Sequence, residues 1–335
     1  MVLAFTRLGD VLYGLVSGLP WPLEVVAFIG LILLVETLVG LPLAFWRSYV
    51  RERRWGLSTQ RLGGWLADQA KGLAVSALLT AGALLGLVAL ARVLPGLWPL
   101  PAAVAAALLV IVLGFVAPIV LEPIFNRFEH LRDEGLHAEL RALADRAGAP
   151  VRDVLVADAS RRTRKLNAYV SGFGRTRRVV LYDTLLRTAR GDEIAAVVAH
   201  ELGHRRERHV IKLTLIGMTG TAAGVLALWL VLGTKVADPR QIPLILLIGI
   251  VLELVGLPLF ATISRRWERV ADRFALELTR DPSAVESSFR RLAAGNVADL
   301  DPPRLLHLLT ATHPTLPERI AASRLYAVPR RQAPR

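Results

Sequence analysis

Long runs without charged residues recur along the chain and predict membrane-spanning helices. A spanning helix needs roughly 18 or more consecutive apolar residues. The uncharged runs are residues 72–91, 93–121, 213–234 and 241–264, the last interrupted only by Glu253, and a fifth stretch, 23–46, contains only Glu24 and Glu36. The pattern therefore predicts a mainly α-helical integral membrane protein with about five transmembrane helices. Because Asp10 interrupts the apolar part of the N-terminus, we expect the first span to be retained rather than cleaved.

Two polar regions, 122–212 and 265–327, carry the patterns of a folded domain with a small β-sheet. In the first, Leu136, Leu140, Leu143 and Ala147 recur at helical spacing, and Gly148 ends that helix. Apolar runs at 153–157, 168–173 and 178–182 predict strands, with a hairpin at Gly174. Helices are predicted over 192–209 and 267–278. We expect residues 1–121 to hold three spans, 213–264 to hold two, and the tail 328–335 to be disordered.

The distribution of basic residues predicts which side of the membrane the polar regions occupy. The segment 47–71 contains six Arg or Lys, whereas the turn at 233–241 contains two. By the positive-inside rule the first of these loops is cytoplasmic, and five alternating spans then place both polar regions on that side. Both polar regions are therefore expected to face the cytoplasm.

Composition narrows the possible chemistry. The formal net charge of +13 comes almost wholly from arginine, since only four of the 41 basic residues are lysine. Basic residues beside spans are typical of topology signals and contacts with anionic lipids, and no nucleic-acid-binding motif accompanies them. The absence of cysteine excludes disulfides, thiolate metal sites and a cysteine nucleophile. We therefore expect the lipid bilayer, and not nucleic acid, as a partner.

The sequence His200-Glu201-Leu202-Gly203-His204 carries the clearest chemical signal. Positions i and i+4 lie on one face of a helix, so both imidazoles can bind one cation while Glu201 holds the water that the metal activates. This is the HExxH pattern of zinc hydrolases. By itself the motif also fits two surface histidines on a charged helix.

A tetrahedral zinc site needs a third protein ligand and an open position for water. His209 lies five positions beyond His204, off the metal-facing side of a continuous helix, and is interpreted as a surface or interface residue. Glu268 is the better candidate. Asp272 lies one helical turn later on the same face, where it could accept the free N–H of a ligating histidine.

Several further motifs accompany these residues in order along the chain. They are Glu122-Pro123-Ile124-Phe125-Asn126-Arg127-Phe128, Asn167-Ala168-Tyr169 with Gly172-Phe173-Gly174, Val179 to Leu185, Ser264 to Asp272, and His313-Pro314 followed by Arg319. Together they make the chain resemble the type I CAAX prenyl protease family of integral-membrane zinc metalloproteases, the a-factor-converting enzymes and their bacterial relatives. The resemblance extends from about residue 41 to 325 and implies a gluzincin-type protease domain. The compositional bias toward arginine and alanine favours a bacterial member in the inner membrane, with its active site facing the cytoplasm.

The resemblance implies roles for individual residues. His200, His204 and Glu268 are the expected ligands of a single Zn²⁺, and Glu201 is the expected general base. Asn167, Ala168 and Tyr169 would border the substrate cleft, and His313 and Arg319 would lie close to the metal, where either could stabilise the oxyanion. The family's eukaryotic members resemble barrels of seven helices around a chamber, whereas this chain shows five spans.

Three functions remain open on this sequence. The first is an endopeptidase for membrane-associated or prenylated C-terminal peptides. The second is a heat-shock-type protease that removes damaged membrane proteins. The third is a non-catalytic zinc-binding membrane scaffold, which the presence of both Glu201 and all three ligands disfavours.

Overall fold

The computed structural model describes residues 6–172 and 174–327, so the predicted disorder of 328–335 and the strand end at 173 lie outside the described residues. The chain forms two compact units, which are described separately. The first unit contains the chain up to residue 51, 61–114 and 213–256. The second contains 52–60, 115–212 and the chain from 257 onward.

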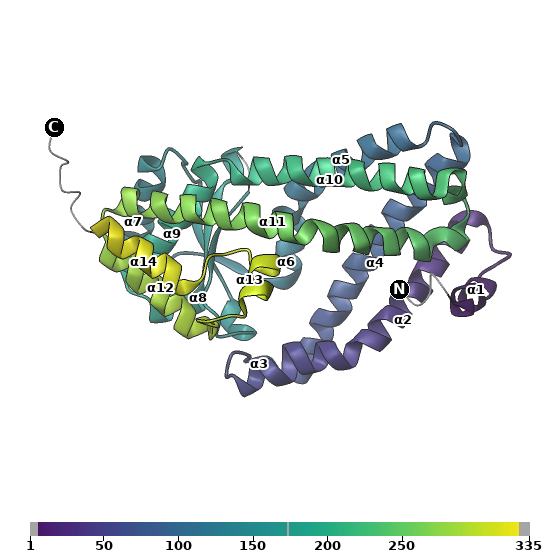
Figure 1. The fold of residues 1–335 in the computed structure, drawn as a ribbon. Coiled ribbons are helices and arrows are strands. Elements are labelled where there is room, and N and C mark those ends of the chain that lie inside the picture. Colours follow the sequence, from purple (N-terminus) through teal and green to yellow (C-terminus); the bar gives the residue numbers. More distant parts are fainter. Residues whose placement is uncertain (1–5, 173, 328–335) are drawn as a thin grey trace. The chain divides into compact units, whose positions relative to one another are not determined.

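The first unit is built from long apolar helices (Figure 1). A short α1 (Arg7–Gly14) precedes α2 (Trp21–Phe45), α4 (Leu62–Val93), α5 (Pro99–Val116), α10 (His209–Leu232) and α11 (Ile242–Thr279), of which α11 belongs to this unit only as far as Gly256. Shorter turns connect them: a π-helix Trp46–Val50, α3 (Arg51–Arg54), and 3-10 helices Gly233–Ala237 and Pro239–Gln241. Phe28, Ile29, Val88, Trp98 and Ile242 are buried in the centre of this unit.

Five helical segments are long and apolar enough to cross a membrane, which confirms the predicted number. They are Trp21–Arg54, Leu62–Val93, Pro99–Phe125, His209–Ala237 and Pro239–Thr279. Only 6–22% of the residues in their most apolar windows are buried, as expected for helices whose outer faces contact lipid rather than water.

The second unit contains a four-stranded sheet in the order β1-β2-β4-β3. Its strands are β1 (Phe128–His130), β2 (Asp153–Ala157), β3 (Ala168–Ser171) and β4 (Arg178–Tyr182). Strand β2 pairs in parallel with β4, while β1 with β2 and β3 with β4 are antiparallel. The predicted hairpin is therefore confirmed, and β3 is an edge strand.

Helices surround this sheet and form the core of the second unit. A π-helix, Ala117–Leu121, is followed directly by α6 (Glu122–Phe125). Other α-helices of the unit are α7 (Glu134–Arg146), α8 (Asp183–Thr188), α9 (Gly191–Arg206), α12 (Pro282–Asn296), α13 (Arg304–Thr310) and α14 (Leu316–Ala327). Two 3-10 turns lie at Ala159–Arg161 and Gly174–Thr176. Leu140 and Leu143 of α7 pack with Val179 and Leu181 of β4 and with Val198 of α9. The centre of β4 is wholly buried, as is typical of a strand covered on both faces.

The predicted limits of two helices were wrong. The helix predicted over 192–209 ends at Arg206, because Arg208 adopts a left-handed conformation (φ 56°) and α10 begins at His209. The helix predicted over 267–278 is the end of α11, which continues without a break from the preceding span. Strand β1 was not predicted, since three residues are too few to show an alternating pattern.

Candidate metal centre

Helix α9, which carries the HExxH motif, is fixed at its first turn by a buried carboxylate. Glu193 is 1% exposed and accepts hydrogen bonds from the backbone N–H of Arg190, from Ser287 and from Arg291. Ser287 and Arg291 belong to α12, so one side chain joins the two helices. Burial by itself would raise the pKa of Glu193, but these hydrogen bonds outweigh it and lower the pKa.

The glycine of the motif lets α9 approach α11 closely. A Cβ atom at Gly203 would lie 3.1 Å from the Cα of Ala271 and 3.2 Å from a ring carbon of Phe274. A Cβ atom here would therefore require the contacting atoms of α11 to move by a few tenths of an ångström. Because α9 carries His200 and His204 and α11 carries Glu268, this contact sets the separation of the three expected ligands.

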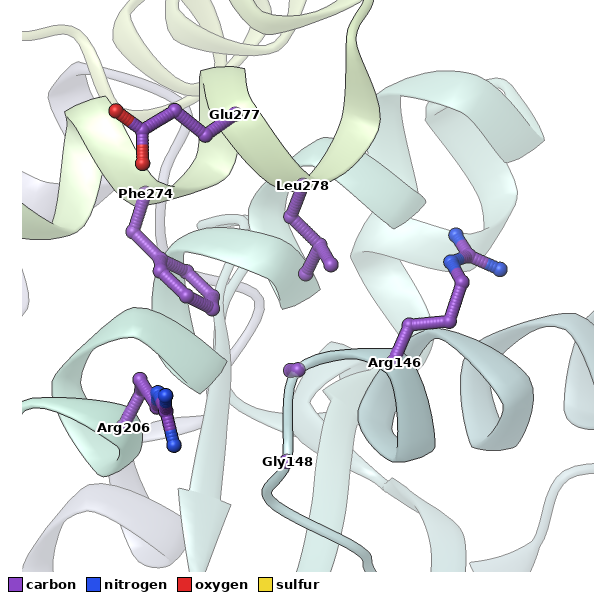
Figure 2. Close-up of a pocket in the computed structure, with 7 residues that line it drawn as sticks. Arg146, Gly148, Arg206, Phe274, Glu277 and Leu278 are labelled. Atoms are coloured by element: carbon purple, nitrogen blue, oxygen red, sulfur yellow. The ribbon is translucent and has the colours of Figure 1, made fainter.

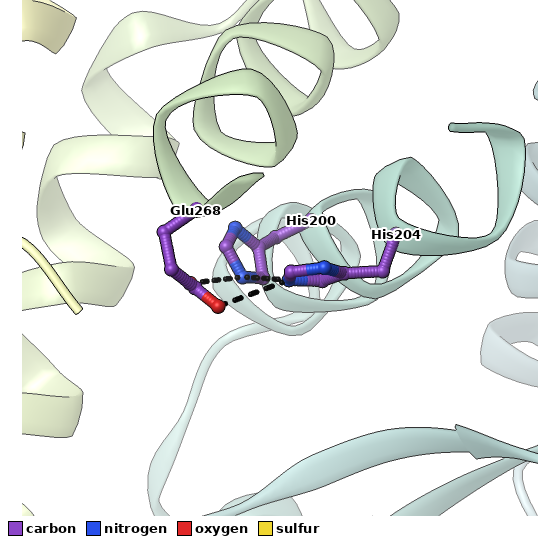
Figure 3. Close-up of side chains that lie close together, drawn as sticks. All are labelled: His200, His204 and Glu268. Atoms are coloured by element: carbon purple, nitrogen blue, oxygen red, sulfur yellow. Dashed lines mark hydrogen bonds and ion pairs between the residues drawn. The ribbon is translucent and has the colours of Figure 1, made fainter. Parts of the chain in front are cut away.

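The three expected ligands converge on one point (Figure 3). The Nε2 atoms of His200 and His204 lie 3.2 Å apart. Glu268 places Oε2 3.2 Å from Nε2 of His200 and Oε1 3.3 Å from Nε2 of His204. All three residues are at least partly buried.

This arrangement fits a tetrahedral metal ion. With metal–nitrogen bonds of about 2.0–2.1 Å, the ligand atoms of a tetrahedral zinc lie about 3.3 Å apart. Oε2 of Glu268 is buried and accepts no hydrogen bond, which is costly unless a cation binds there. Two imidazoles and a carboxylate are also ligands that zinc prefers.

His200 is oriented by an anionic partner. Its Nδ1 lies 2.8 Å from Oδ1 of Asp272, and the guanidinium of Arg319 binds the same carboxylate, with Nε 2.8 Å from Oδ2. Burial would lower the pKa of His200, but the neighbouring carboxylates of Asp272 and Glu268 outweigh it and raise the pKa to about 9. Asp272 thus lies one helical turn from Glu268 and contacts His200, and Arg319 binds Asp272 and also places Nη2 3.5 Å from Nδ1 of His200.

His204 is oriented by a neutral partner that the sequence analysis misplaced. His209 is 4% exposed, places Nδ1 2.9 Å from Nδ1 of His204, and stacks on Trp267 with ring centroids 4.9 Å apart. The interpretation of His209 as a surface or interface residue away from the expected ligands was wrong, because it assumed that the helix continues through Arg208. The left-handed turn at Arg208 begins a new helix at His209, and there the His209 ring lies against the ring of His204.

Glu201 borders a cleft of about 430 Å³ that also reaches His200, His313 and Arg319. Burial raises the pKa of Glu201, which makes the carboxylate a stronger base than an exposed one. His313 places Nε2 3.3 Å from Oε2 of Glu268, and its side chain is 58% exposed. Its imidazole is therefore beside the ligands yet accessible from the cleft.

The edge strand β3 borders the same cleft. Asn167 and Ala168 line it, whereas Tyr169 is not among the lining residues. The Tyr169 hydroxyl instead donates to Glu122, 3.3 Å away, and Ser171 donates to the same carboxylate at 2.8 Å. Glu122, which the sequence analysis noted only as part of a motif, thus fastens β3 to the chain segment that follows α5.

A second cavity in this unit, of about 290 Å³, contains none of the motif side chains (Figure 2). It is lined by Arg146, Ala147 and Gly148 at the end of α7, by Arg206, and by Phe274, Glu277 and Leu278 of α11. The cleft beside His200, and not this cavity, is therefore the one that motif residues line: Asn167, Ala168, His200, Glu201, His313 and Arg319.

Two family models match the chain and together cover most of it. The model described as "Peptidase family M48" matches residues 130–326. The model described as "CAAX prenyl protease N-terminal, five membrane helices" matches residues 5–127. Within the described part of that match, three of the five candidate spans are found.

Comparisons with individual proteins indicate the same family relationship. The Bacillus subtilis (strain 168) protein "Uncharacterized metalloprotease YhfN" is 31% identical over 314 residues, which is 89% of this chain and 72% of that protein. "CAAX prenyl protease 1" of Saccharomyces cerevisiae is 32% identical over 197 residues, 58% of this chain and 43% of that protein. The crystal structure of S. mikatae Ste24p, 24% identical, has the same fold, with a TM-score of 0.80 over 94% of this chain and 79% of that one.

Proposed function

Since the chain belongs to peptidase family M48 and is a multi-pass membrane metalloprotease, we propose that it is a zinc endopeptidase for membrane-associated peptides, including prenylated CAAX-type C-termini. One observation carries this proposal. The ligand atoms of His200, His204 and Glu268 converge at the spacing of a tetrahedral site, and Glu201 borders the cleft that leads to it.

The residues around the cleft have matching roles in peptide hydrolysis. Zinc held by His200, His204 and Glu268 would supply a polarised water of pKa about 7 and a Lewis acid for the peptide carbonyl. Glu201 takes the proton from the attacking water and returns it to the leaving amine. His313 donates to the oxyanion, while Arg319, held by Asp272, orients His200.

Strand β3 is proposed to bind the substrate. Its outer edge has no partner strand among the described residues, and Asn167 and Ala168 lie at its cleft end. An extended peptide that pairs with this edge gains backbone hydrogen bonds and lies across the metal site. The carboxylate of Glu122 holds β3 in place through Ser171.

The membrane context supports substrates at the bilayer surface. The apolar run of α11 ends at Ser264, only four residues before Glu268. We place the active site on the cytoplasmic face of a bacterial inner membrane, because the basic residues of 47–71 follow the first span.

The test is cleavage of a farnesylated CAAX-type peptide and its unprenylated twin by the detergent-purified protein. Glu201→Gln is the inactive variant and Glu139→Gln, an exposed position on α7, is the matched control. We expect the Glu201 variant to keep its zinc and to lose turnover by at least about 100-fold, the lower range of a general base's contribution. Full activity of Glu201→Gln would refute the mechanism.

The same assay separates the substrate classes. Preferential cutting of the farnesylated peptide supports a role in prenyl-peptide processing. Equal, Glu201-dependent cutting of both peptides indicates general membrane-protein proteolysis of the quality-control kind.

A further inference from the structure

Helix α13 exposes an unusually apolar surface for a segment outside the five spans. Leu305 is 70% exposed, Leu306 57%, Leu308 48% and Leu309 41%, and no residue of the helix is buried. Side chains of this kind are normally withdrawn from water. A contiguous exposed apolar patch marks a surface that binds a partner or a membrane.

The four leucines share one face of α13. Positions 305, 306, 308 and 309 follow the i, i+1, i+3, i+4 spacing, which groups side chains on one side of a helix. His307 falls on the opposite side and lines the catalytic cleft, whereas none of the four leucines does. The leucine face therefore points away from the cleft that His307 lines.

Hydrogen bonds from Arg265 hold α13 next to the end of the apolar run of α11. Its guanidinium is buried and donates to the carbonyls of Ala311, at 2.6 Å, and Leu308, at 3.0 Å. These carbonyls lie at the C-terminal end of α13, where the helix itself leaves acceptors without partners. Arg265 is also the first charged residue after the uncharged run 254–264 of α11.

We propose that α13 is an interfacial helix that inserts its leucine face into the lipid bilayer. Arg265 ties the helix to the residue at which α11 leaves the apolar layer, so the leucines lie at the boundary between headgroups and acyl chains. Arg304 at the start of α13 and Arg266 beside Arg265 supply the cations that interact with anionic headgroups at this depth. The helix therefore holds one wall of the catalytic cleft, that of His307, against the membrane surface.

The absence of cysteine allows a direct test with single labels. Leu305→Cys, Leu306→Cys and Leu309→Cys each carry one nitroxide in the full-length protein, reconstituted into vesicles of phosphatidylcholine and phosphatidylglycerol. Electron paramagnetic resonance then compares collisions with oxygen, which dissolves in acyl chains, and with a water-soluble nickel chelate. Ala142→Cys on the exposed side of α7 is the water-facing control, and Leu254→Cys within the α11 span is the lipid-facing control.

We expect the ratio of oxygen to nickel collisions on α13 to be several-fold higher than at Ala142 and to approach that at Leu254. A nickel accessibility equal to that at Ala142 would mean that the leucines face water and would overturn the proposal. Protection from both reagents would mean that a protein surface or a second copy covers them, which also overturns it. A diazirine-bearing phospholipid checks the unsubstituted chain: a peptide containing 304–310 becomes crosslinked if α13 is interfacial and stays unmodified if it is not.

Discussion

Replacing His209 with phenylalanine removes a hydrogen-bond acceptor from the metal centre and keeps an aromatic ring against Trp267. When Nε2 of His204 binds a metal, the proton of that neutral imidazole must be on Nδ1. The acceptor for this proton is Nδ1 of His209, 2.9 Å away. In the Phe variant the N–H of His204 has no partner and its ring is no longer held in the ligating orientation.

The expected magnitude follows from the partial burial of the pair, in which His209 is 4% exposed and the His204 side chain is 22% exposed. Leaving a buried donor without a partner costs about 1–3 kcal/mol. Because about 1.4 kcal/mol corresponds to tenfold in an equilibrium constant, His209→Phe should weaken zinc binding by roughly 10- to 100-fold. His209→Gln, which offers a side-chain oxygen as acceptor, should recover part of that loss.

Asp272→Asn weakens the corresponding hydrogen bond on His200 and so allows a comparison with the effect of His209→Phe on His204. The Asp272 carboxylate receives hydrogen bonds from both His200 and Arg319, and bonds to a charged group are about twice as strong as neutral ones. The loss of zinc affinity should therefore be larger for Asp272→Asn than for His209→Phe. The opposite order would refute the assignment of the stronger orienting interaction to Asp272.

The assay is competition for zinc between the detergent-purified metal-free protein and a chelator of known affinity, with thermal unfolding as a check that each variant is folded. Unchanged zinc affinity in His209→Phe would show that the hydrogen bond between the two histidines has no orienting role. Equal affinities of the Phe and Gln variants would show that His209 acts by packing on Trp267 alone.

Two further predictions concern the framework of the site. Gly203→Ala should lower both thermal stability and zinc affinity, by about 1–3 kcal/mol of overpacking strain, because its Cβ would contact Ala271. The control is Gly220→Ala on α10, where a Cβ would meet nothing within 4 Å. Equal effects of the two substitutions would contradict the close-packing argument. Glu193→Gln should destabilise the protein by about 1–3 kcal/mol at neutral pH, because the ion pair with Arg291 is lost. Since the pKa of Glu193 is lowered on folding, its stabilising contribution is present above the ordinary carboxyl value of 4.5 and disappears as pH falls through the folded pKa. The melting temperatures of wild type and Glu193→Gln should therefore converge in acid, and a difference that stays constant with pH would argue against the ion pair.

The sequence predicted those parts of the molecule that depend on periodicity or on local motifs. Uncharged runs located the five spans, and strands β2 and β4 have the predicted limits, because buried strands and lipid-facing helices are distinguished by length and apolar content. The i, i+4 spacing placed His200 and His204 on one side of α9. These features need no knowledge of the tertiary structure.

The features that were missed depend on a single backbone conformation or on contacts between distant segments. Nothing in the sequence marks Arg208 as left-handed, since this conformation is unusual for any residue but glycine, and so the position of His209 was wrong. The unbroken α11 was predicted in two pieces because the charges that begin at Arg265 end the apolar run without ending the helix. The bonds from Ser171 to Glu122 and from Arg265 to the end of α13 join residues more than 40 positions apart and have no local signal.

The continuity of α11 determines how far the metal centre can lie from the bilayer. A helix rises about 1.5 Å per residue, so Glu268 lies only about 6 Å beyond Ser264, the last residue of the apolar run. Arg265, which directly follows Ser264, donates a hydrogen bond to the carbonyl of Leu308 in α13. His307 on that helix lines the cleft. A peptide anchored in the membrane would therefore reach the proposed zinc from the headgroup layer, whereas a folded soluble protein would have to bring an extended segment to the bilayer surface. Under the proposed function, this geometry would favour substrates that are attached to the membrane, and it would apply equally to a prenylated C-terminus and to a segment emerging from a damaged membrane protein.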